Sequence, residues 1–194
     1  MSYLSFKYDD LLTVSEALDI AEDATANFYK FSSGQWKRHR YEVKTFSSLR
    51  PYEITQQAFA LLNKGSRIIC DYELKTKNHD FYFICLQDHQ ILKALKRDKA
   101  LGFLSLLVYI FTHELVHIVR FCNFFQRFDV SGQEKEKEET VVHETTYEIL
   151  EDLSLPKLDY VLDSYQGHRV CDIVFSKNSD GNRMEVTRSA DLRV

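Results

Sequence analysis

Two histidines and a glutamate in the segment HELVH, residues 113 to 117, have the types and the spacing to bind and use a metal ion. An α-helix turns about 100° per residue, so His113 and His117 would lie about 40° apart on one helix face and could share one ion. Glu114 would point about 100° away from His113, where it can reach a water molecule without binding the metal. The pattern is typical of zinc hydrolases that use the glutamate as general base.

The helix that carries this motif is expected to span residues 100–122 and to be buried. Apolar residues cover most of its circumference, and LGFLSLLVYIFT, residues 101 to 112, precedes the motif. The polar residues fall on one stripe, within about 80° of one another: Tyr109, His113, His117 and Arg120. The apolar run is too short to cross a bilayer, and a longer span would force charged residues into lipid. We therefore predict a buried central helix of a soluble protein, with a stripe that faces a cleft or another element.

A catalytic zinc ion generally needs a third protein ligand and an open position for water. The next expected helix, residues 131–153, has an apolar face formed by Val142, Ile149, Leu150 and Leu153. On this helix Glu139 lies within the apolar face and His143 lies at its edge, whereas Glu138 lies just outside the opposite edge. Because a carboxylate on a core-facing surface needs a partner, zinc is a candidate for that partner. The helix positions thus make Glu139 a candidate third ligand, with His143 and Glu138 among the alternatives.

With this second helix, the sequence resembles the zincin metallopeptidases, specifically the minimal members of the gluzincin branch. Gluzincins carry a ligating glutamate on a helix that follows HExxH, and a polar residue four positions further on. Here HELVH is followed, after 21 residues, by ETVVH, residues 139 to 143. The resemblance implies that His113, His117 and Glu139 bind Zn²⁺, that Glu114 is the general base, and that His143 takes the position commonly held by an aspartate.

The resemblance covers roughly residues 67 to 153 and also implies a substrate site. In gluzincins an edge strand upstream of the HExxH helix binds the substrate backbone, and DFYFICL, residues 80 to 86, is the expected counterpart. The implied activity is hydrolysis of peptide bonds through a zinc-activated water, with a peptide or protein as substrate.

Other interpretations stay open at this point. A histidine offers no carboxylate to orient a ligand imidazole, so His143 could itself be the third ligand with Glu139 behind it. The two motif histidines could lie in the protein without a metal. A di-iron bundle would need a second ExxH, and the second helix carries ExxxH instead. A catalytically silent zinc-binding interaction domain is the main alternative to a peptidase, because spacing singles out no oxyanion donor among several candidates: Arg120, Tyr147, Tyr160, Tyr165 and His168.

The whole pattern predicts an α+β, zincin-like fold in which a small antiparallel or mixed sheet packs on the HExxH helix and on the ligand-bearing helix. Residues 1–175 form the expected single domain, with a helical N-terminal portion (1–65) and a metal-site core (67–153). A mobile tail is expected after it, at 176–194. Further helices are expected at 13–31, 52–64, 88–97 and 157–165. Strands are expected at 40–46, 67–75, 80–86 and 169–175, with a hairpin turn at 76–80.

Composition limits the partners that we expect. The chain has 25 basic and 29 acidic residues and a net charge of -4, which does not favour nucleic acid. The basic run WKRHR, residues 36 to 40, is interpreted as a solvated segment, and His39, His79 and His89 as solvent-exposed residues. Four cysteines without a CxxC pair, and an N-terminus without a signal-peptide pattern, predict a reducing cytoplasm. We expect no membrane partner, and the sequence leaves the oligomeric state open.

Overall fold

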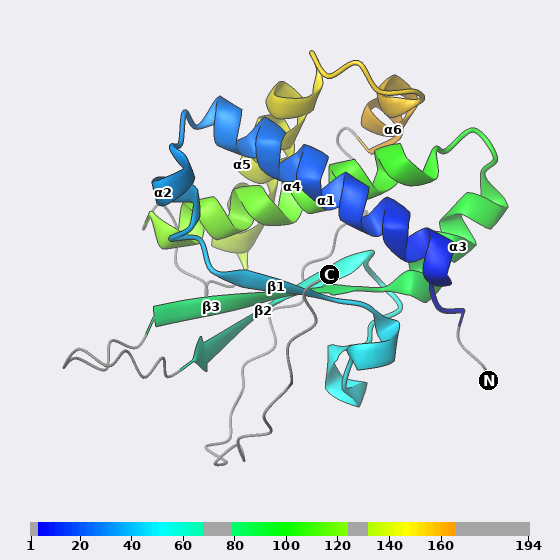
Figure 1. The fold of residues 1–194 in the computed structure, drawn as a ribbon. Coiled ribbons are helices and arrows are strands. Elements are labelled where there is room, and N and C mark those ends of the chain that lie inside the picture. The colour runs from blue at the N-terminus through cyan, green and yellow to red at the C-terminus, as the bar shows by residue number, and fades with distance from the viewer. Residues whose placement is uncertain (1–3, 68–78, 124–131, 166–194) are drawn as a thin grey trace.

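The described part of the protein, residues 4–67, 79–123 and 132–165 of a computed structural model, has an α+β fold. Figure 1 shows helices gathered on one side of a small sheet. The helices and strands follow one another in this order: α1 (Tyr8–Phe28), α2 (Ser33–Trp36), β1 (Tyr41–Lys44), β2 (Ala60–Arg67), β3 (His79–Leu86), α3 (Asp88–Arg97), α4 (Phe103–Cys122), α5 (Gln133–Leu150) and α6 (Leu158–Tyr165). Two short 3₁₀ turns, Phe46–Ser48 and Pro51–Glu53, lie between β1 and β2.

The three-stranded sheet is mixed, and its order is β1-β3-β2. Strand β1 runs parallel to β3, with Tyr41 opposite Tyr82, and β2 runs antiparallel to β3, with Ala60 opposite Leu86. Strand β3 is therefore bonded on both sides. The prediction that residues 80 to 86 form a free sheet edge is wrong, and β1 and β2 are the outer strands of the described sheet.

The prediction of a helix at 52–64 is also wrong. Only Pro51–Glu53 forms a helical turn, and residues from Ala60 onward belong to β2. A short apolar run such as AFALL has the same pattern in a buried helix and in a buried strand, and here pairing with β3 decides for the strand. The predicted helix end, Gly65, lies inside β2, where an added Cβ would come 2.8 Å from Cε2 of Phe83. The N-terminal portion thus contributes two strands to the sheet and is not simply helical.

Helix α4 is buried on almost every side, as predicted. It packs along α1 and against β2 and β3, and most of its side chains are inaccessible to solvent. The core face of the sheet meets this layer through Leu62, Ile84 and Leu86, which are fully buried. Helix α4 is long and apolar enough to cross a membrane by length and composition, but 83% of the relevant window is buried inside the protein.

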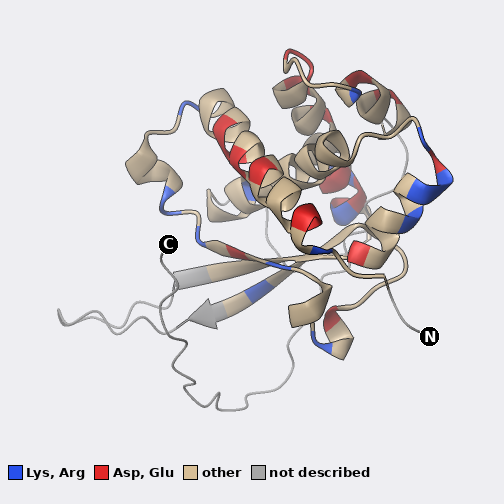
Figure 2. Ribbon diagram, turned by 45° about the vertical axis from the view of Figure 1, so that its right-hand side comes forward, with Lys and Arg blue, Asp and Glu red and all other residues tan. Residues whose placement is uncertain are grey.

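The other helical predictions agree with the structure within a few residues, except at the start of α1. The expected start at residue 13 is wrong, because the helix begins at Tyr8 and the Asp10 carboxylate accepts a hydrogen bond from the Lys7 backbone N–H at 2.8 Å. Every charged side chain of α1 is acidic (Figure 2). Residues 68–75, most of the expected turn, the strand 169–175 and the tail 176–194 lie outside the described residues.

Two of the histidines interpreted as solvent-exposed are buried. His39 is 8% exposed and stacks on Phe31, and His89 is 6% exposed and bonds through Nε2 to the Thr55 carbonyl at 3.0 Å. Cys85 and Cys122 are free thiols, as predicted, whereas Cys70 and Cys171 lie outside the described residues.

Candidate metal centre

The polar stripe of α4 faces α5, and later residues of α4 meet earlier residues of α5. Near the start of α4, the Tyr109 hydroxyl lies 2.9 Å from Nδ1 of His143. Near its end, Arg120 donates to the Glu138 carboxylate from two nitrogens, at 2.6 and 2.8 Å. Between these two contacts, His113 and His117 both face Glu139. The stripe on α4 and the α5 residues that face it are called here the α4–α5 seam: Tyr109, His113, His117, Arg120, Glu138, Glu139 and His143.

The centre of the seam has the spacing of a metal site. One carboxylate oxygen of Glu139 lies 3.5 Å from Nε2 of His113 and 3.7 Å from Nε2 of His117. Ligands about 2.1 Å from a tetrahedral ion are separated by roughly 3.4 Å, so these distances leave room for one ion between the three side chains. The ligand atoms of His113, Glu139 and His143 also lie within 4.8 Å of one another.

The seam buries polar atoms that make no hydrogen bond to any described residue. These atoms are both ring nitrogens of His113 and both carboxylate oxygens of Glu114 and of Glu139. His113 and Glu114 are completely inaccessible to solvent. Leaving such groups buried without partners costs free energy, whereas an ion and a water molecule at this place would satisfy them. The donor set, two imidazoles and a carboxylate, suits zinc.

Burial and neighbouring charge set the protonation of the seam. Burial raises the pKa of Glu114 to about 8, and the negative charge of Glu139 adds to the rise. For Glu139 itself burial would raise the pKa, but the adjacent His113 and His117 outweigh it and hold that pKa well below its usual range. Burial lowers the pKa of His113 below its usual value and that of His143 to about 4, so both rings are neutral at pH 7. Neutral imidazoles and an ionised Glu139 are the forms that bind a metal.

Glu138 is a residue whose part in the site the sequence missed. It was placed just outside the apolar face of its helix, yet it is only 5% exposed. Besides its two bonds to Arg120, its carboxylate lies 3.9 Å from Nδ1 of His117. Tyr109 was also given no role, although it contacts His143 directly. The polar stripe on α4 could have revealed both contacts, because its outer members, Tyr109 and Arg120, need partners on the facing helix.

The proposed oxyanion donors are distributed unevenly around the seam. The guanidinium of Arg120 is engaged by Glu138, and Tyr160 is exposed and donates to Asp98 at 2.8 Å. Tyr165 stacks on Tyr109, with ring centroids 5.7 Å apart, and so lies beside the His143 end of the seam. Tyr147 is half-buried against the core, and His168 lies outside the described residues.

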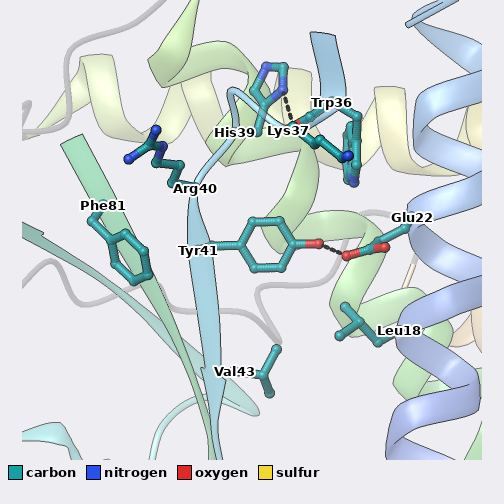
Figure 3. A pocket seen from close by; sticks show the side chains of 9 residues that line it. All are labelled: Leu18, Glu22, Trp36, Lys37, His39, Arg40, Tyr41, Val43 and Phe81. Atoms are coloured by element: carbon teal, nitrogen blue, oxygen red, sulfur yellow. Dashed lines mark hydrogen bonds between the residues drawn. The ribbon is translucent and has the colours of Figure 1, made fainter. Parts of the chain in front are cut away.

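A separate hollow of about 440 Å³ lies between α1 and β1, away from the seam (Figure 3). Trp36, Lys37, His39 and Arg40 from the basic run line it, so this run is only partly a solvated segment. The hydroxyl of Tyr41 donates to the Glu22 carboxylate across the hollow. None of the seam residues lines this hollow.

Comparisons with known proteins add no further assignment. No protein family, curated protein or solved structure matches the chain. The resemblance to gluzincins therefore stays a prediction that rests on the HELVH motif, on the spacing to Glu139 and on the geometry of the seam.

Proposed function

We propose that this protein is a zinc-dependent metallopeptidase of the gluzincin type. The observation that carries the proposal is a buried Glu114 without a hydrogen bond to any described residue, next in the chain to His113, whose ring and that of His117 both approach one oxygen of Glu139. The charge of Glu139 acts on Glu114, which supports a position of this carboxylate near the metal site. A metal site with a structural role alone has no use for such a carboxylate. A hydrolase needs it to move a proton.

Four side chains have a part in the proposed reaction. His113, His117 and Glu139 hold the ion, which when bound lowers the pKa of a water molecule and polarises the substrate carbonyl. Glu114 takes the proton of the attacking water and later passes it to the leaving amine. In the metal-free protein burial raises the pKa of Glu114 to about 8. A bound cation beside it would lower that pKa and favour the ionised form, which is the form that acts as a base.

Residues 80 to 86 form the inner strand of the described sheet, so a substrate peptide would have to pair with another strand.

The test is cleavage of a peptide library by the zinc-loaded protein. We expect cleavage by the wild type to disappear with a chelator, and to fall by more than about 100-fold in Glu114→Gln, because the proton transfer is lost. Glu144→Gln, which changes an exposed glutamate of α5, is the matched control and should keep full activity. If wild type, variant and chelated samples all give the same product, the peptidase proposal is wrong.

A second candidate is a zinc-binding interaction domain without catalysis. The nearness of His143 to His113 and Glu139 favours it, because a fourth protein ligand would close the position that water needs. This candidate predicts zinc binding without cleavage by any variant. For either candidate we propose the cytoplasm as the compartment, on the basis of the cysteine pattern.

A further inference from the structure

His143 lies closer to the candidate ion than a purely supporting residue needs to be. Its ring centroid is 4.6 Å from that of His113, and its ligand atom falls within the 4.8 Å group that also contains Glu139. Its position at the edge of the apolar face of α5 points it toward α4. One group of ligand atoms thus contains His113, Glu139 and His143, and His117 lies 3.7 Å from the same Glu139 carboxylate.

The second nitrogen of His143 is arranged as it is in metal-binding histidines. Nδ1 lies 2.9 Å from the Tyr109 hydroxyl, which leaves Nε2 available for an ion. A ligand histidine almost always has its outer nitrogen held by a polar group, which fixes the ring orientation and its tautomer. Tyr109 holds the ring of His143 in this way.

We propose that His143 is a fourth protein ligand, so that the resting site holds its ion through His113, His117, Glu139 and His143 and is closed to water. This inference rests on the proposed metal site and concerns its regulation. Four protein ligands are the mark of a closed site, whereas a catalytic site keeps one position open. Hydrolysis would then require His143 to leave the ion when the substrate carbonyl arrives.

Burial and charge together identify His143 as the ligand that can leave. His113 and His117 are completely buried on α4, whereas Glu139 and His143 on α5 are both only partly buried. Of these two, Glu139 carries the negative charge and lies close to both α4 histidines, so the neutral His143 is the ligand that can leave. A side chain with access to solvent can rotate without opening the core. The protein would therefore be latent when zinc-loaded and become active when a substrate displaces His143.

X-ray absorption spectroscopy of the zinc-loaded protein tests this assignment by counting imidazole ligands. We expect three in the wild type, two in His143→Ala, and three in Glu144→Gln as a control. The zinc affinity of His143→Ala should fall by about 10-fold or more, because one bond to the ion is lost. Azide, added to the Co²⁺-substituted proteins, should change the visible spectrum of His143→Ala and leave that of the wild type unchanged.

The outcomes separate this inference from the proposed function. Two imidazoles in the wild type would overturn the fourth ligand and leave the peptidase intact. Three imidazoles, with no Glu114-dependent cleavage by wild type or by His143→Ala, would keep the fourth ligand and overturn the peptidase. Absence of zinc from the wild type would overturn both. If His143→Ala does not fold, His143→Asn replaces it, and the imidazole count of the wild type still decides.

Discussion

Two regions of this protein bury polar side chains, and they differ in whether the buried polar atoms form hydrogen bonds to described residues. At the turn between β3 and α3, Asp88 is 1% exposed, yet its carboxylate oxygens accept hydrogen bonds from the backbone N–H groups of Phe6 and Phe46, at 2.9 and 3.0 Å. Gln87 beside it accepts from the Thr55 N–H and donates to two backbone carbonyls. This Gln87–Asp88 turn ties together segments that are far apart in the sequence.

The α4–α5 seam also brings together distant segments, but its central polar atoms remain without hydrogen bonds to described residues. A buried polar group stabilises a fold only when its bonds are made, and otherwise lowers stability. The side chains of the turn therefore serve the fold, whereas those of the seam reduce stability unless a ligand arrives. This contrast is the physical reason to assign function to the seam, and the following changes test it.

The largest expected effect is on zinc binding by the seam. His113→Leu should lower zinc affinity by more than about 100-fold, because outer partners of a ligand already contribute 10- to 100-fold and a ligand contributes more. The free energy of unfolding of the metal-free variant should change by less than about 2 kcal/mol, because the leucine replaces ring nitrogens without hydrogen bonds but also removes the 3.5 Å contact that helps to keep Glu139 ionised. Competition with a chromogenic chelator and urea unfolding with chelator present measure the two quantities. Unchanged affinity would remove His113 from the site.

At the Gln87–Asp88 turn we expect a substitution to lower the free energy of unfolding and to leave zinc affinity unchanged. Asp88→Ala should lower the free energy of unfolding by about 2–4 kcal/mol, because two backbone N–H groups lose their acceptor. Zinc affinity of the folded variant should not change. Asp152→Ala, at an exposed position, is the control in the same urea experiment. A loss below about 0.5 kcal/mol, which is ordinary for an exposed position, would show that the turn is not the structural counterpart of the seam.

A smaller effect is expected in the pH dependence of the metal-free protein. The pKa of Glu114 is raised to about 8 from its usual 4.5, so the folded protein holds a proton that the unfolded chain has lost. The contribution of Glu114 to stability should therefore fall as pH rises, by about 1.6 kcal/mol between pH 6.5 and 8. The pKa values of four histidines are lowered from 6.5, so their contributions rise over the same window and oppose that of Glu114: His39, His89, His113 and His143. The contribution of Glu114 is therefore the difference between the wild type and Glu114→Gln.

Urea unfolding at several pH values, with chelator present, measures this slope. The stability of Glu114→Gln should rise relative to that of the wild type as pH increases from 6.5 to 8, because the Glu114 contribution is removed, while Glu144→Gln should keep the pH dependence of the wild type. Equal slopes in the wild type and in Glu114→Gln would mean that the Glu114 carboxylate is hydrated in the metal-free protein.

The same contrast explains what the sequence could and could not predict. Helical periodicity is a local property, so it correctly predicted a buried α4 whose polar stripe faces a partner, and it placed Glu139 toward His113 and His117. Pairing between strands is not local. The strand β2 was therefore taken for a helix, and β3 for an edge. Glu138 was missed for a related reason, since its burial depends on Arg120 of another helix.

The smallest expected effect is at Tyr109, whose hydroxyl could belong to either kind of buried polar group. Its hydrogen bond to His143 could stabilise the fold, as at the Gln87–Asp88 turn, or orient a ligand, as in the seam. If it orients a ligand, Tyr109→Phe should lower zinc affinity by about 10-fold and change the free energy of unfolding of the metal-free protein by less than about 1 kcal/mol. Tyr165→Phe, which alters the ring stacked on Tyr109, is the control. A variant that loses stability but keeps its zinc affinity would place Tyr109 with the structural turn, because an orienting bond acts through the ion and a structural bond does not.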